Sequence, residues 1–160
     1  MMLSQSNRDA EICIVGRTDF SSGIGRMTLS ACQMLGRAFP ICILPTDPHS
    51  RSLDSVSLPN GGSIQVCKDA SRIKVWFFAD VLWNGVHDFN YALAGEGLRV
   101  AQIVFDSTEI PLEWVNILND RFDVVLVTST YMVDVAKTSG VTIPIGVLPI
   151  ALERAIAESW

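Results

Sequence analysis

A glycine-rich segment near the start of the chain has residue types suited to binding a phosphate. The tetrapeptide GIGR at 23–26 follows a polar loop at 17–22 and opens a stretch in which apolar side chains have helical spacing. Glycine lets a ligand approach the backbone closely, and the first turn of a helix attracts anions. An arginine side chain holds phosphate oxygens in a bidentate contact. We therefore predict that Gly23, Gly25 and Arg26 bind the phosphates of a ligand. The alternative is a tight turn with a solvated arginine.

Two acidic residues, Asp106 and Glu109, follow an apolar run at 98–105 that indicates a strand. Carboxylates at the end of a strand can hydrogen-bond a substrate hydroxyl or stabilise positive charge that develops during a reaction. We predict a catalytic role for both residues. The alternative is that they cap the helix expected to begin at Pro111, because the amino end of a helix attracts carboxylates.

Further polar positions are candidates for contacts with a second substrate. Asp19, Phe20 and Ser21 lie in the polar loop before the glycines, and Ser129 follows an apolar run at 122–127. Ligands of parallel sheets gather where the strands end. We predict that these four residues bind this second substrate, which is the acceptor under the family resemblance described below. The competing interpretations are a solvated loop and, for Ser129, a helix cap.

No metal site is expected from the spacing of the histidines and cysteines. His49 and His87 stand alone in the sequence, and the cysteines at 13, 32, 42 and 67 form no C-x-x-C pair. Three of the cysteines lie in apolar runs, where a free cysteine behaves as a small core residue. We interpret the cysteines as reduced and structural.

An alternation of expected strands and helices positions these candidate residues. The expected strands span 12–15, 41–44, 64–67, 73–79, 98–105, 122–127 and 143–148, and the expected helices span 23–39, 84–97, 111–120, 130–137 and 152–160. A long loop with turn residues throughout is expected at 46–62. This alternation predicts an α/β fold, a Rossmann-like open parallel sheet with helices on both faces.

The composition fits one domain and excludes some partners. The 160 residues are 49% hydrophobic and 18% charged, which indicates a well-buried sheet or a face that a partner covers. The net charge of −5, without a cluster of Lys and Arg, excludes duplex nucleic acid as the main partner. The amino terminus lacks the apolar core of a signal peptide, and no apolar run approaches the roughly 20 residues of a membrane span. We predict a cytoplasmic location, and peripheral contact with the inner face of the membrane stays open.

An NAD(P)-dependent reductase of the short-chain type is one alternative function. The segment SSGIGR at 21–26 is similar to the cofactor loop of that family, and Asp47 would then bind the ribose. The family also needs a lysine four residues after its catalytic tyrosine, and both Tyr91 and Tyr131 lack that lysine. This interpretation therefore lacks its proton donor.

The second half of the chain resembles the retaining glycosyltransferases of the GT-B fold, in the broad family 4 group. In that group a helix with an acidic residue and a tryptophan precedes a strand that ends in serine. Another helix and a segment with the pattern sGv-x-x-P-x-x-v-x-P follow. The matching residues here are Trp114, Phe122-Asp123, Ser129, Ser139-Gly140-Val141, Pro144 and Pro149. The GIGR segment also fits the glycine loop of that group, so the resemblance covers about residues 11–153.

This resemblance implies one half of a two-domain enzyme whose active site lies in the cleft between the domains. It implies a Rossmann-like, acceptor-side domain at 11–150, after a flexible N-terminus at 1–10 and before the start of an inter-domain linker or helix at 151–160. It further implies a nucleotide-sugar co-substrate, a glycan or lipid-linked acceptor, no other cofactor, and a C-terminal donor domain that is missing here. We expect hexosyl transfer in polysaccharide biosynthesis, with no turnover by the isolated domain. A non-catalytic Rossmann-like binding module stays open as a further alternative.

Overall fold

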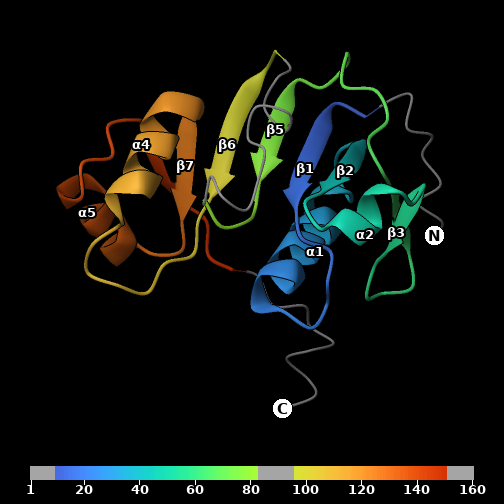
Figure 1. The fold of residues 1–160 in the computed structure, drawn as a ribbon, viewed down its shortest axis with the longest axis horizontal. Helices are drawn as coiled ribbons and strands as arrows, with labels where there is room; N and C mark the ends of the chain where they lie inside the picture. The colour runs from blue at the N-terminus through green and yellow to red at the C-terminus, as the bar shows by residue number, and fades with distance from the viewer. Residues whose placement is uncertain (1–9, 83–95, 151–160) are drawn as a thin grey trace.

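The apolar runs of the sequence form a six-stranded parallel sheet in the computed structural model, which describes residues 10–82 and 96–150 (Figure 1). The strands are β1 (Ile12–Gly16), β2 (Ile41–Pro45), β5 (Val75–Phe78), β6 (Leu98–Gln102), β7 (Val124–Val127) and β8 (Ile145–Val147). They lie in the order β2-β1-β5-β6-β7-β8, and every neighbouring pair is parallel. The carboxyl ends of the strands therefore meet at one edge of the sheet, where the arrowheads lie in Figure 1.

A small antiparallel hairpin, β3 (Ser55–Ser57) with β4 (Ser63–Gln65), extends this sheet beyond β2. After β4 the chain runs beside β2. Val66 forms a parallel bridge with Ile43, and the N–H of Cys67 donates to the main-chain oxygen of Ile43 at 2.7 Å. With this short contact counted as a strand, the order along the sheet is that of a doubly wound Rossmann-type fold.

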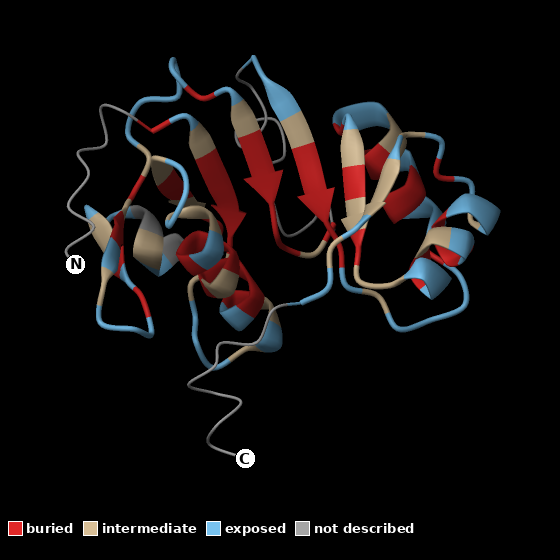
Figure 2. Ribbon diagram, turned by 180° about the vertical axis from the view of Figure 1, so that it is seen from behind, coloured by how far each residue is buried: buried red, intermediate tan, exposed pale blue. Residues whose placement is uncertain are grey.

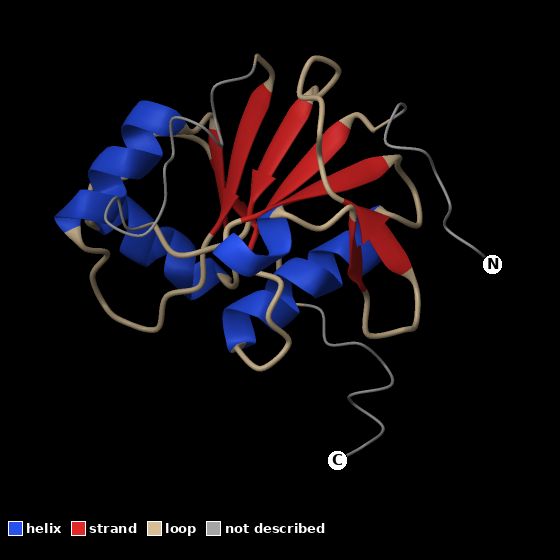
Figure 3. Cartoon of the chain, turned by 45° about the vertical axis from the view of Figure 1, so that its right-hand side comes forward, coloured by secondary structure: helices blue, strands red, loops and turns tan. Residues whose placement is uncertain are grey.

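Helices cover both faces of the sheet, because successive strand residues point to opposite sides. α1 (Gly23–Leu35) packs on the face that carries Ile14, together with the hairpin. α4 (Leu112–Arg121) and α5 (Thr130–Thr138) pack on the face that carries Val15. Figure 2 shows the middle of the strands buried between these layers, and Figure 3 shows the helices flanking the strands. The prediction of a Rossmann-like open parallel sheet with helices on both faces is confirmed.

The segment 46–62 is not the continuous loop that its turn residues predict. It contains the short helix α2 (Pro48–Arg51), which is followed by β3. A proline suits the first helical turn, where no N–H is needed. β3 forms because Val56 lies opposite Ile64 of β4 and both side chains are buried. Such cross-strand pairs stabilise a hairpin, and the turn residues alone do not reveal them.

Two of the predicted elements end three or more residues before their apolar runs do. α1 ends at Leu35 rather than near residue 39, and the N–H of its cap residue Gly36 donates to the oxygen of Cys32. β6 ends at Gln102 rather than at residue 105, and the side chain of Val104 is 42% exposed. In both cases, apolar residues continue along the sequence after the helix or strand has ended.

The predicted helix at 84–97 lies almost wholly outside the described residues. The N-terminal segment 1–9 and the predicted helix at 152–160 lie outside them as well. None of the helices in the described ranges has the length and apolar character needed to cross a membrane.

Candidate functional site

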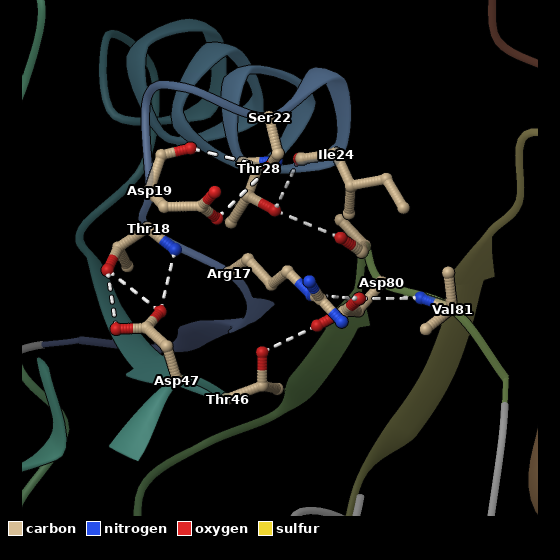
Figure 4. Close-up of polar contacts among 12 residues, drawn as sticks. Arg17, Thr18, Asp19, Ser22, Ile24, Thr28, Thr46, Asp47, Asp80 and Val81 are labelled. Carbon is tan, nitrogen blue, oxygen red and sulfur yellow. Dashed lines mark hydrogen bonds and ion pairs between the residues drawn. The ribbon is translucent and has the colours of Figure 1, made fainter. Parts of the chain in front are cut away.

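The strand order changes direction between β1 and β5, and this marks the candidate site. The chain places β2 on one side of β1, then adds β5 to the other side and continues outward through β6, β7 and β8. In open parallel sheets, ligands bind beyond the carboxyl ends of the strands at such a change of direction. Polar side chains from the segments that follow β1, β2 and β5 gather at this place (Figure 4).

Asp80 is the buried centre of these polar side chains. Its side chain is 0% exposed, and its Oδ2 accepts a hydrogen bond of 2.5 Å from the hydroxyl of Thr46. Its Oδ1 lies 3.3 Å from the Nε of Arg17 and accepts the N–H of Val81 at 2.7 Å. The Arg17 side chain remains 37% exposed. A buried carboxylate thus holds a guanidinium that still faces solvent, where it can meet a ligand with phosphate or hydroxyl oxygens.

A second group of hydrogen bonds lies over the end of β2. The N–H and the hydroxyl of Thr18 donate to Oδ1 of Asp47 at 2.8 and 2.9 Å, and the hydroxyls of Thr18 and Ser50 lie 2.7 Å apart. Partial burial favours the neutral form of Asp47, but hydrogen bonds from Ser50 and Thr18 outweigh it and hold the pKa of this carboxyl below its usual value. Asp47 is therefore ionised at neutral pH. Five residues make up what we call the switch-point cluster: Arg17, Thr18, Thr46, Asp47 and Asp80.

The first turn of α1 is covered by its own loop at Gly25. The hydroxyl oxygen of Ser22 accepts the N–H of Gly25 at 2.9 Å, as the N-cap of the helix. A Cβ on Gly25 would lie 1.9 Å from the main-chain oxygen of Asp19, so only glycine lets the loop pack this closely. Gly23 and Arg26 are exposed. Two of the three residues predicted to bind phosphate are therefore accessible to a ligand. Gly25 is buried, because the loop packs against it.

The predicted acceptor-binding residues of this loop lie beside the switch-point cluster. The carboxylate of Asp19 accepts hydrogen bonds from the hydroxyls of Ser22 at 3.0 Å and Ser21 at 3.3 Å. The side chain of Phe20 is 49% exposed. Figure 4 places Asp19 next to Thr18, between the end of β1 and the start of α1. The loop therefore carries both polar and apolar groups at the carboxyl edge.

The predicted catalytic carboxylates belong to another loop. Asp106 and Glu109 are exposed between β6 and α4. The N-cap of α4 is Pro111 and no side chain caps this helix, so the alternative that the two carboxylates cap it is wrong. Ser129 is the N-cap of α5, and its hydroxyl oxygen accepts the N–H of Met132 at 3.3 Å. The capping interpretation of Ser129 is confirmed, and its contact with an acceptor stays a prediction.

Our sequence reasoning missed Arg17, Thr46 and Asp80 as a unit. Arg17 directly follows β1, Thr46 directly follows β2, and Asp80 comes two residues after β5. Their position after three apolar runs was the signal available in the sequence, since parallel strands bring their carboxyl ends together. These three residues meet because β1 lies between β2 and β5 in the sheet. The periodicity of the sequence does not reveal this strand order.

Folding also brings together cysteines that are far apart in the sequence. The sulfur atoms of Cys13, Cys42 and Cys67 lie within 4.8 Å of one another. Among the described residues, this is the single group of His, Cys, Asp or Glu with the proximity that a metal ion needs. All four cysteines carry free thiols in this structure, and their reduced state in the cell stays a prediction.

Comparison with known proteins adds no relative. No protein-family model, no curated protein and no solved structure matches this chain. What the protein does is therefore inferred from its own residues and their arrangement.

Proposed function

We propose that this chain is the acceptor-side half of a glycosyltransferase of the GT-B type that uses a nucleotide-sugar. The observation that carries the proposal is the switch-point cluster, in which a buried carboxylate holds a half-exposed guanidinium at the change of strand order. Guanidinium N–H groups donate in pairs to phosphate and carboxylate oxygens, and they also donate to the hydroxyls of a glycan. The resemblance of the second half of the chain to retaining glycosyltransferases supports the same class.

In this proposal the acceptor binds along the loop at 17–22. Arg17 donates to acceptor oxygens, and the exposed carboxylate of Asp19 accepts from acceptor hydroxyls. Phe20, which is 49% exposed, offers an apolar surface to a sugar ring. Gly23 and Arg26, exposed at the start of α1, contact the diphosphate of the donor.

The proposed reaction needs no metal and no further cofactor. The bond between the sugar carbon and the donor phosphate breaks, and a bond from that carbon to the acceptor oxygen forms. The proton of the acceptor hydroxyl passes to the departing phosphate. Asp106 and Glu109 stabilise the positive charge that develops on the sugar carbon, because both carboxylates are exposed and neither is engaged in a helix cap.

Exposed apolar side chains suit contact with a second domain. Val104, Leu112 and Tyr131 are 42%, 71% and 57% exposed. They come from the segment after β6 and from the first residues of α4 and α5. Contiguous exposed apolar surface marks contact sites, and we propose that these three side chains contribute to such a surface. The same observation favours the second candidate function, a non-catalytic module that binds a protein partner.

A dinucleotide-dependent reductase is less well supported. Such an enzyme needs a lysine four residues after its catalytic tyrosine to form the proton donor. Gly95 stands at that distance from Tyr91, and Val135 from Tyr131. The proposed location is the cytoplasm, and a lipid-linked acceptor would bring the protein to the inner face of the membrane.

Ligand binding to the full 160-residue chain tests this proposal. The panel for a thermal-shift measurement contains short glycans, nucleotide-sugars, free nucleotides and the NAD(P) cofactors. A ligand that binds the folded state raises the Tm by an amount set by its concentration relative to Kd. We expect a shift with a glycan, its loss in Arg17→Gln, and its retention in Arg37→Gln, which changes an exposed arginine beyond the far end of α1. A shift with NADP alone contradicts the proposal, and silence across the panel favours the protein-binding module.

A further inference from the structure

Three thiols meet on the face of the sheet that α4 and α5 cover. Cys13 of β1 and Cys42 of β2 are direct register partners in parallel strands, so their side chains point to the same face. The N–H of Cys67 donates a hydrogen bond to the main-chain oxygen of Ile43, the residue that follows Cys42 in β2. All three sulfur atoms lie within 4.8 Å of one another. We call Cys13, Cys42 and Cys67 the thiol cluster. Sheet pairing holds the backbone of Cys13 and Cys42, and Cys67 directly follows the isolated bridge between Val66 and Ile43.

The thiol cluster has a buried side and an accessible side. Cys13 and Cys42 are 0% exposed within the apolar core, whereas Cys67 is half-buried. One half-buried sulfur at the rim thus faces two sulfurs inside the core. Cysteine binds metals as the thiolate, which forms when the thiol gives up its proton to a bound metal ion.

We propose that the thiol cluster is a binding site for a thiophilic d10 metal ion, and that Cu(I) is the ion that fits it. Soft thiolate ligands select Cu(I) and Zn²⁺ among the common transition metals. Three sulfurs placed around one ion at about 2.3 Å would be about 4 Å apart, which is a small contraction from the present spacing. Structural Zn²⁺ sites take four protein ligands. In the described ranges no fourth His, Cys, Asp or Glu joins the group, whereas Cu(I) is stable with three sulfurs.

Binding at this site is a ligand exchange without oxidation or reduction. Cu(I) enters past Cys67, and each of the three thiols releases its proton to solvent as its metal–sulfur bond forms. The apolar surroundings of the two inner sulfurs exclude water from the ion. Cys13 lies in β1 and Arg17 directly follows this strand. The four-residue separation corresponds to about 13 Å along a strand, so the thiol cluster and the switch-point cluster are separate sites. The proposed metal site therefore does not rest on the proposed transferase function.

The competing explanation is that the three cysteines are only small core residues. Packing alone accounts for Cys13 and Cys42, because free cysteine is among the most buried residue types. It accounts less well for Cys67, which is only half-buried and lies outside the strands. A fourth buried cysteine, Cys32, lies in the core on the other face of the sheet and provides a matched control.

An anaerobic titration of the full chain with Cu(I), in competition with a chromophoric Cu(I) chelator, tests the proposal. We expect one equivalent to bind the wild-type chain. Cys67→Ala should weaken binding by more than the roughly 10–100-fold that loss of an outer-shell partner costs. Cys32→Ala should bind as the wild type does. X-ray absorption at the copper edge should show sulfur ligands alone, and bound Cu(I) should protect Cys67 from alkylation.

Several results would overturn the proposal. They are no binding of Cu(I) by the wild-type chain, unchanged binding in Cys67→Ala, or an equal loss in Cys32→Ala. Tighter binding of Zn²⁺ than of Cu(I) in a parallel titration would overturn the assignment of the ion. Circular dichroism shows whether each variant folds. We expect Cys67→Ala to fold, because Cys67 is only half-buried. If that variant nevertheless fails to fold, Cys67→Ser replaces it with the same expected loss.

Discussion

The main-chain oxygen of Asp19 lies 1.9 Å from the position that a Cβ on Gly25 would occupy. This contact folds the loop after β1 back over the first turn of α1, where the hydroxyl of Ser22 already accepts the N–H of Gly25. The second glycine of the GIGR segment is therefore required by the loop itself. The first one, Gly23, has no heavy atom within 4 Å of its Cβ position.

Gly25→Ala should destabilise the protein, and Gly23→Ala should not. A methyl group at position 25 overlaps the backbone of the loop, and we expect a loss of about 1–3 kcal/mol in the free energy of unfolding. At position 23 the methyl group meets open space, and alanine restricts the unfolded chain, so a gain of up to about 1 kcal/mol is expected. Denaturant unfolding of the two variants measures both effects. Equal stabilities would show that the contact with Asp19 has no energetic weight.

Asp80→Ala should cost more stability than Arg17→Gln. Removal of the buried carboxylate deprives the hydroxyl of Thr46 and the N–H of Val81 of their acceptor, at a cost of about 1–3 kcal/mol for each group. Arg17 is 37% exposed, and solvent screens its ion pair, so its replacement should cost about 1 kcal/mol or less. Urea unfolding of both variants compares the two costs. A larger cost for Arg17→Gln would mean that the ion pair, rather than the hydrogen bonds, holds the switch-point cluster together.

Stability in acid should depend on Asp47. Its pKa in the folded protein is lower than its usual value of 3.8, so the unfolded state takes up the proton first as the pH falls. The contribution of Asp47 to stability is therefore complete above its usual pKa and is lost as the pH falls through the lower pKa of the folded state. Asp47→Asn should lower the free energy of unfolding at neutral pH, and the difference from the wild type should shrink in strong acid.

A control for this pH dependence is Asp120→Asn, which changes an exposed carboxylate on α4. We expect this variant to follow the wild-type curve of stability against pH. If Asp47→Asn also follows it, the hydrogen bonds from Thr18 and Ser50 do not favour the ionised form.

Ser129→Ala should destabilise the domain by about 1 kcal/mol, because α5 loses its N-cap. Thr130→Ala, at the next position, removes an exposed hydroxyl from the first turn of the same helix, and it should change stability by less than about 0.5 kcal/mol. Thermal unfolding of the two variants compares the stability lost with the N-cap to the stability lost when a neighbouring hydroxyl is removed. A similar loss in both would assign the effect to the helix start as a whole.

Joint replacement of Asp106 and Glu109 by Asn and Gln should leave stability within about 0.5 kcal/mol of the wild type. Both side chains are exposed, and α4 has no side-chain cap that the change would remove. Under the proposed function these carboxylates act on charge that develops during sugar transfer, so the same variant should keep the wild-type thermal shift with a glycan. Loss of that shift would contradict this role and assign the two carboxylates to acceptor binding instead.

Local patterns in the sequence determine the elements of this protein and their faces. The apolar run at 12–15 indicates a strand, and its residues are buried on both faces of the sheet. Ser129 identifies the start of α5 because a serine side chain satisfies a free N–H of the first turn. The α/β alternation then restricts the fold to a parallel sheet between helices.

Only the tertiary structure decided which of these residues meet. Thr46 and Asp80 are 34 positions apart, and they touch because β1 lies between β2 and β5. The thiol cluster arises in the same way from the register of β1 with β2 and from the path of the chain after β4. Periodicity and capping report on neighbours within a few residues, whereas strand order and register depend on the packing of the whole sheet. The sequence by itself therefore determined the class of fold and the edge where a ligand would bind, and the assembled sheet decided which side chains form the two candidate sites.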